Sequence, residues 1–263
     1  MKKYYKILVI ILKNAYIRDS KIPGYIFMNL MFQFAEMTVT IIFFNVIFEN
    51  TKTLVGWNFY QVLFLYMFAR MTFSLHKAFF RGGFNLISGN LIRNGDYDFY
   101  LTKPVNSLFL ASVNKPRIYE FIAIIFQIGI AIWAIVIGNL AISTLSVFWF
   151  IYLAILASIL LYYLAVLTVT PVFWLIKVWS LRDVVPRLQA FMRYPLGVFP
   201  GYLKIILMGI FPIMATSYIP VRTLFYPPEM KYILYMTLIT LIFVFIGRWF
   251  WKLGEKNYGS ASS

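Results

Sequence analysis

Long apolar stretches alternate with short polar connections along most of this chain. A helix that crosses a bilayer needs about 20 predominantly apolar residues. Six segments meet this requirement, at roughly 24–48, 57–75, 118–138, 145–172, 203–220 and 232–250. The pattern therefore predicts an all-α integral membrane protein, with six transmembrane helices in a single domain over residues 1–263.

The fifth of these segments is interrupted by helix-breaking residues. Pro195, Gly197, Pro200 and Gly201 precede it, and Pro212 lies inside it. Proline removes a backbone donor and breaks a helix, and irregular backbone at membrane depth must be buried in protein. A kink, a broken helix and a re-entrant piece are therefore all compatible with this stretch.

The first 22 residues differ from the spans because they are short and charged. Over residues 2–18, a helix would separate its apolar side chains from its basic and amide side chains, with Tyr4, Tyr5, Leu8, Ile11, Leu12, Ala15 and Tyr16 on one side and Lys2, Lys3, Lys6, Lys13 and Asn14 on the other. A helix of this kind lies in the membrane interface, with its cations among anionic headgroups. We expect residues 1–22 to form an interfacial helix on the cytoplasmic surface.

Positive charges are concentrated in every second connection. One set of connections carries Lys2, Lys3, Lys6, Lys13, Arg18, Lys21, Lys77, Arg81, Arg93, Lys103, Lys115, Arg117, Lys177, Arg182, Arg187, Arg193, Arg248, Lys252 and Lys256. The opposite set carries only Lys52, Arg222 and Lys231. Because cytoplasmic loops are enriched in lysine and arginine, both termini are expected in the cytoplasm. That result requires an even number of spans.

The amino-acid composition excludes several classes of protein and several kinds of site. With 62% hydrophobic and 13% charged residues, the chain is too apolar for a soluble domain, and its net charge of +15 is scattered among loops rather than gathered into a nucleic-acid-binding face. The absence of cysteine excludes disulfides and thiolate metal sites, and a single histidine makes a histidine metal site unfavourable. We therefore expect no metal and no catalytic residues in this chain.

The connection at 76–117 is the longest on the cytoplasmic side. Within it, apolar side chains alternate with charges of both signs over residues 91–106, and Pro104 lies near the end of this stretch. This pattern is typical of a short surface helix that contacts a partner protein. An interfacial loop that only contacts lipid headgroups would have the same pattern.

The same run, I-R-N-G-D-Y-D-F-Y-L-T-K-P-V-N from Ile92 to Asn106, resembles the cytoplasmic signature of ABC-2 type permeases. These are the six-span membrane subunits of ATP-driven transporters. Two further patches agree with the resemblance: Arg193-Tyr194-Pro195 with Phe199-Pro200 and Phe211-Pro212, and Tyr258-Gly259-Ser260-Ala261-Ser262. Many relatives have an acidic-Gly-Thr-Leu-Glu pattern where this chain has Asn94-Gly95-Asp96-Tyr97-Asp98, so the family fits better than any narrow subgroup.

The resemblance implies an ABC-2 (type V exporter-like) permease fold in a prokaryotic cytoplasmic (inner) membrane. Separate ABC ATPase subunits would bind ATP and Mg, and the chain indeed contains no G-x-x-x-x-G-K-[ST] motif. A second permease subunit, identical or paralogous, would complete the pathway. Two six-helix halves would then export an amphiphilic or lipid-like substrate by alternating access.

The resemblance also implies a coupling helix, a cytoplasmic helix that docks on the ATPase and transmits its closure to the spans. Carried over by position, the residues that would form or frame it are Arg93, Gly95, Asp96, Asp98, Phe99, Leu101, Lys103 and Pro104. Acidic side chains at 96 and 98 can pair with basic groups of a partner, and the apolar residues can fill a groove.

Two ionisable residues, Glu36 and Arg70, fall inside predicted spans. Each would cost about 2.5–3.5 kcal/mol if it faced lipid. Counted from the external ends of their helices, both lie at a similar depth, so antiparallel packing of the first two spans would pair them. A substrate contact, or an Arg70 side chain that extends toward the interface, is also compatible with these positions.

Two other classes of protein fit the chain less well. An ATP-independent secondary transporter or channel would be expected to have inverted repeats and discontinuous helices with polar residues near the midplane. An integral membrane enzyme acting on lipid would need a catalytic group of His, Asp, Cys or metal ligands, and the chain has one histidine and nine acids, most of them in loops.

Overall fold

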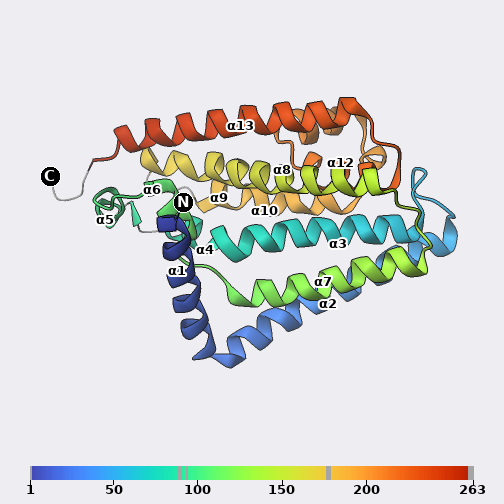
Figure 1. Ribbon diagram of the computed structural model, residues 1–263, viewed down its shortest axis with the longest axis horizontal. Helices are drawn as coiled ribbons and strands as arrows, with labels where there is room; N and C mark the ends of the chain where they lie inside the picture. Colours follow the sequence, from blue (N-terminus) through green and yellow to red (C-terminus); the bar gives the residue numbers. More distant parts are fainter. Residues whose placement is uncertain (1, 88–90, 93, 176–178, 260–263) are drawn as a thin grey trace.

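The computed structural model describes residues 2–87, 91–92, 94–175 and 179–259, and within these ranges the regular elements are helices. The long helices form the bundle in Figure 1: α2 (Pro23–Asn50), α3 (Phe59–His76), α7 (Ile118–Ile137), α8 (Thr144–Val169) and α13 (Met230–Lys256). A further long helix, α1 (Lys2–Ser20), runs across one end of the bundle. We name this the α1 end, and we name the end with the connections 51–58, 138–143 and 226–229 the opposite end.

Shorter elements connect the long helices. A π-helical turn (Lys77–Arg81) and α4 (Gly82–Leu86) prolong α3, and α5 (Asp98–Leu101) and α6 (Ser107–Val113) follow at the α1 end. A 3-10 turn (Thr170–Phe173) prolongs α8. Between α8 and α13 the chain forms α9 (Trp179–Arg182), α10 (Val184–Leu188), the 3-10 turns Gln189–Arg193 and Leu196–Val198, α11 (Gly201–Ile205), a π-helical turn (Ile206–Ile210) and α12 (Ala215–Phe225).

Four of the described helices are long and apolar enough to cross a membrane: α2, α7, α8 with its continuation to Phe173, and α13. A bent pair, Gly201–Ile210 and Ala215–Phe225, adds a fifth candidate. The helix at the second predicted span, α3, is not among them, because Gln61, Arg70 and His76 make it more polar. It is nevertheless the central helix of the bundle, since every residue from Val62 to Ala69 is at most 6% exposed.

The segment after α8 runs along the whole bundle. Asp183 Oδ1 accepts a hydrogen bond at 3.0 Å from Arg81, which follows α3 at the α1 end. Further along the chain, Arg193 pairs with Glu36 in the middle of α2. A Cβ at Gly197 would touch the side chain of Val55 at the opposite end. Residues 183–197 therefore pass from one end of the bundle to the other.

The bent pair begins and ends at the opposite end. Gly201 follows this crossing directly, and Tyr226, just after α12, donates its hydroxyl hydrogen to the Gly56 carbonyl at 3.1 Å. The two halves meet at an angle of 102°, around the Phe211-Pro212 dipeptide. Because both ends lie at the same end of the bundle, the pair is a re-entrant hairpin and does not cross the bundle.

Of the three forms that the prolines leave open for the predicted span at 203–220, the structure has the re-entrant one. The bundle is crossed between α8 and α13 by residues 183–197, which the sequence placed in a cytoplasmic loop because of their charge. Prolines and a glycine divide this crossing into short pieces, so it lacks the continuous apolar run of a regular span. Its charged ends are paired: Asp183 contacts Arg81, and Arg193 contacts Glu36.

The interfacial helix α1 is attached to the bundle by polar contacts near its C-terminal end. The buried Asp19 carboxylate accepts a hydrogen bond at 3.2 Å from the backbone N–H of Ile118, the first residue of α7. Arg18 donates to the Pro116 carbonyl at 2.6 Å. Tyr5 and Tyr16 stay 70% and 62% exposed, an arrangement compatible with a helix that contacts lipid.

The close packing of α4 on α6 generates a prediction. A Cβ at Gly83 would collide with the backbone carbonyls of Ala111 and Ser112, whereas one at Gly129 in α7 would meet no atom within 4 Å. Gly83→Ala should lower the free energy of unfolding by about 1–3 kcal/mol, as overpacking does. Gly129→Ala, the matched control, should be neutral or stabilise by up to about 1 kcal/mol. Equal thermal unfolding temperatures of the two variants in detergent would contradict this packing.

Candidate functional site

Residues 94–106, the docking segment, lie at the α1 end next to α6 (Figure 1). Gly95 adopts a φ of 79°, which favours glycine, and the Asp98 N–H donates to its carbonyl at 3.2 Å. Only the four residues of α5 are helical. The expected surface helix is therefore a single turn within a compact loop, because the left-handed Gly95 precedes it and Pro104 follows it. Arg93 lies outside the described residues.

The inner side of the docking segment is held by two buried tyrosines. Tyr97 is fully buried, and its hydroxyl donates to Glu255 of α13 at 2.5 Å. The Ser107 hydroxyl donates to the same carboxylate oxygen. Burial raises the pKa of Tyr97, and the Glu255 hydrogen bond raises it further, so the phenol stays protonated and remains a donor. Tyr100, which stacks on Tyr97 with ring centroids 6.0 Å apart, is the second buried ring.

Aromatic side chains from the ends of α8 and α13 surround Tyr97. Its ring packs edge-on against Phe173 at 5.6 Å, Trp251 at 6.3 Å and Tyr258 at 5.4 Å between centroids. Burial raises the pKa of Tyr258, and the nearby Asp98 carboxylate raises it further. The structure therefore brings together two of the sequence patches, 92–106 and the start of 258–262, while Ser260 to Ser262 lie outside the described residues.

The outer side of the docking segment is exposed. Phe99 is 61% exposed and Leu101 45% exposed, although both are large and apolar. The Lys103 ammonium lies 4.0 Å from the centre of the Phe99 ring. Asp96 and Pro104 are also exposed, and Asp98 is partly buried beside Tyr258. Apolar, acidic and basic groups thus share one small surface.

The N-terminal end of α1 touches this segment, which sequence reasoning missed. Lys3 Nζ donates to the Pro104 carbonyl at 2.8 Å, and the Asn106 N–H donates to the Tyr4 hydroxyl at 3.4 Å. The Tyr4 ring packs edge-on against Phe109 at 5.0 Å. No local sequence signal connects positions so far apart in the chain.

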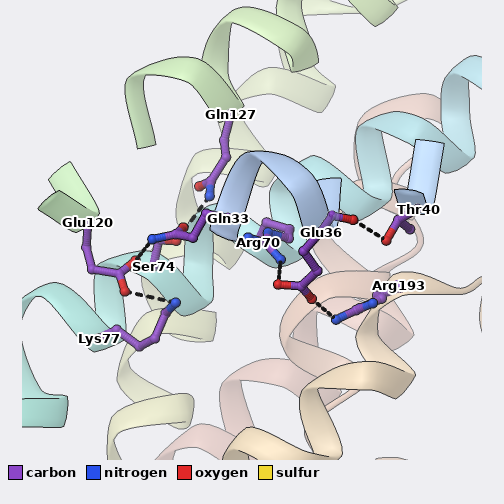
Figure 2. Close-up of polar contacts among 9 residues, drawn as sticks. All are labelled: Gln33, Glu36, Thr40, Arg70, Ser74, Lys77, Glu120, Gln127 and Arg193. Atoms are coloured by element: carbon purple, nitrogen blue, oxygen red, sulfur yellow. Dashed lines mark hydrogen bonds and ion pairs between the residues drawn. The ribbon is translucent and has the colours of Figure 1, made fainter. Parts of the chain in front are cut away.

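A second group of polar residues joins the long helices of the bundle (Figure 2). Glu36 Oε2 of α2 is 2.6 Å from Arg70 Nη1 of α3, and the other carboxylate oxygen accepts from Arg193. Arg70 is 4% exposed, whereas Glu36 is 46% exposed. The structure brings together the two residues that the sequence paired by depth. Arg193 was not expected there, because it was counted among the cytoplasmic cations.

Closer to the α1 end, Glu120 of α7 joins the same helices (Figure 2). Its carboxylate is 1% exposed, lies 2.9 Å from Lys77 Nζ and accepts from Gln33 of α2 at 3.4 Å. Gln127, also of α7, donates to Ser74 of α3 at 3.1 Å. The signal for the Lys77–Glu120 pair was available in the sequence, since one residue follows the second predicted span and the other opens the third.

Comparison with known proteins identifies the family. A family model described as "ABC-2 family transporter protein" matches residues 34–262. No curated protein and no solved structure matches the chain. The match begins inside α2, includes the docking segment and the Glu36–Arg70 pair, and confirms the resemblance seen in the sequence. The described helices agree with a multi-pass membrane protein, and such permeases typically work with ABC ATPase partners. The chain therefore belongs to the ABC-2 family of transporter proteins.

Proposed function

We propose that this chain is the membrane-spanning permease subunit of an ATP-driven exporter. It pairs with a second permease subunit and with two ATPase subunits, which bind ATP and Mg and carry out hydrolysis. Their closure moves the docking segments, and the two halves expose an amphiphilic or lipid-like substrate to the outside by alternating access. The α1 end, with both termini, lies in the cytoplasm of a prokaryotic cell.

The observation that carries this proposal is the two-sided docking segment. Its outer side presents Phe99 and Leu101 to a partner, and its inner side is fixed to Glu255 by Tyr97. An exposed apolar surface beside charges is typical of a protein interface. Tyr97 also packs on Phe173 and Trp251. A displacement of the docking segment by the ATPase would therefore be transmitted through these contacts to the ends of α8 and α13.

A specific observation favours the alternative function, that of an ATP-independent secondary transporter or channel. The crossing at 183–197 is irregular, and Glu36, Arg70 and Arg193 meet inside the bundle. Discontinuous crossings with polar groups near the midplane are typical of secondary transporters. The two are separated by co-expressing this chain with an ABC ATPase encoded by a neighbouring gene and measuring vanadate-sensitive ATP hydrolysis by the complex, because only the ABC permease predicts that activity.

The docking prediction uses charge and apolar variants. Asp96→Arg reverses an exposed charge, and Phe99→Ala removes an exposed ring, so each should lower co-purification with the ATPase at least about tenfold, the loss typical of an interface hot spot. Membrane insertion should stay normal. Tyr5→Ala is the control, because it also removes an exposed ring, which is 70% exposed on α1. Normal ATPase association and transport in the Asp96 and Phe99 variants would refute this role of the docking segment.

The topology prediction uses the absence of cysteine in the natural chain. Six crossings result if α2, α3, α7, α8, residues 183–197 and α13 each span the membrane once. Val55→Cys and Val198→Cys, at positions 56% and 41% exposed, should then react with a membrane-impermeant maleimide added outside intact cells. Leu101→Cys should react only after permeabilisation. Labelling of Val198→Cys only from the inside would support the sequence-based fifth span at 203–220 instead.

The ion-pair prediction is a double-mutant cycle. Glu36→Gln and Arg70→Met should each lower the free energy of unfolding, because the first leaves the buried Arg70 without its carboxylate and the second leaves Glu36 with Arg193 as its remaining cation. The double variant should be more stable than the sum of the two losses predicts, with a coupling energy of roughly 0.5–3 kcal/mol. Thermal or denaturant unfolding in detergent measures all three variants, and additive losses would show that the pair does not stabilise the fold.

A further inference from the structure

A groove with a positively charged mouth lies on one side of the bundle, near the α1 end. Two adjoining cavities of about 600 and 530 Å³ share Phe80, Tyr162, Tyr163 and Arg248 among their lining residues. A third cavity of about 390 Å³, on the outer surface of α13, also reaches Arg248 and Lys252. The three spaces therefore meet at Arg248.

Apolar and aromatic side chains form most of both cavities, and the cavities differ in their charged residues. We name the cavity with Arg248, Lys252 and Glu255 the polar part, and the cavity that it adjoins the apolar part. Leu75, Phe79, Ile159 and Val244 line the cavity that extends toward the middle of the bundle. Arg248, Lys252 and Glu255 line the cavity nearer the α1 end. A mostly apolar groove with its charges gathered near one end matches an amphiphile with a headgroup at the α1 end and a chain that extends toward the membrane interior.

The charges at the polar part are not balanced. Arg248 Nε donates to the Tyr163 hydroxyl at 2.8 Å, but among the described residues no acid lies within 4 Å of Arg248 or Lys252. Glu255 lies nearby, yet its carboxylate accepts from Tyr97 and Ser107. Two cations therefore face the groove together with one carboxylate that is already hydrogen-bonded.

We propose that the groove binds one anionic phospholipid, with its phosphate between Arg248 and Lys252 and an acyl chain along Phe79 and Ile159. A guanidinium binds a phosphate through two parallel hydrogen bonds, and the aromatic walls formed by Phe80 and Tyr162 suit the glycerol region. The inference rests on the proposed function only in placing the α1 end at the cytoplasmic leaflet, since lipid binding requires no transport.

Native mass spectrometry of the 263-residue chain in detergent tests the charge requirement. Dimyristoyl phosphatidylglycerol should bind more tightly than dimyristoyl phosphatidylcholine. Arg248→Gln should weaken the first phosphatidylglycerol about tenfold, the loss of one charge-assisted contact. Lys256→Gln, a control on the same helix, removes the same charge without touching the groove and should change the affinity less than about twofold. If the two variants weaken phosphatidylglycerol binding equally, Arg248 acts only through its contribution to the net positive charge. That result would overturn the proposal.

A second pair of variants tests the apolar part without changing charge. Ile159→Trp should fill the cavity and weaken phosphatidylglycerol binding by a similar factor. Ile155→Trp, one turn away at a residue that is 57% exposed and does not line the groove, should not. Unfolding temperatures equal to that of the wild type establish that both variants fold. Wild-type binding by Ile159→Trp would exclude this groove.

Failure of this inference is distinguishable from failure of the proposed function. Lipid binding is measured on the permease chain alone, whereas the proposed function is tested by association with the ATPase. Loss of lipid selectivity in Arg248→Gln with normal ATPase association supports the lipid site by itself. Normal lipid selectivity in Arg248→Gln overturns the lipid site, whatever the ATPase result.

Discussion

The fold depends on the pairing of charges inside an apolar bundle. An ion left unpaired in a membrane span costs about 2.5–3.5 kcal/mol, so the Glu36 carboxylate needs cationic neighbours. It has two, Arg70 from the adjacent helix and Arg193 from the irregular crossing. Together with Asp183 and Arg81 at the α1 end, these contacts allow a polar, proline-rich stretch to lie along the bundle. The re-entrant hairpin at 201–225 follows from that path, since the chain has already reached the opposite end.

The contacts of the docking segment explain how it could act on the membrane helices. Glu255 and Trp251 belong to α13, and Phe173 continues α8, so the segment is joined to the two longest helices after α2. Lys3 and Tyr4 join it to α1 as well. In our proposal, ATPase closure therefore moves α8 and α13 first and shifts α1 along the membrane surface at the same time.

The regular helices could be predicted from the sequence, and the irregular crossing could not. The helices α2, α7, α8 and α13 begin and end within a few residues of the predicted spans at their positions, or extend slightly beyond them, because each contains a long apolar run. The stretch at 183–197 contains Asp183, Arg187 and Arg193, which local reasoning assigns to a loop. Asp183 and Arg193 are paired with Arg81 and Glu36, which are distant in the chain, and only the folded structure brings them together.

At the docking segment, the sequence identified the charged and apolar residues but not their orientation. Alternation of apolar and charged positions did not separate Tyr97 and Tyr100, which are buried, from Phe99 and Leu101, which are exposed. The difference comes from Gly95, whose positive φ turns the chain before the single turn of α5, and from Glu255, far away in the sequence. Side-chain orientation in such a short loop depends on long-range contacts.

The topology depends on the path of residues 183–197, and a distance measurement can follow that path. Spin labels can be attached to single cysteines, since the natural chain has none. Double electron–electron resonance in detergent should give a short distance between labels at positions 55 and 198, and a distance longer by roughly the length of α3, about 27 Å, between labels at 198 and 101. A long distance from 198 to 55 and a short one from 198 to 101 would place position 198 at the α1 end. That result would contradict a crossing of the bundle by residues 183–197.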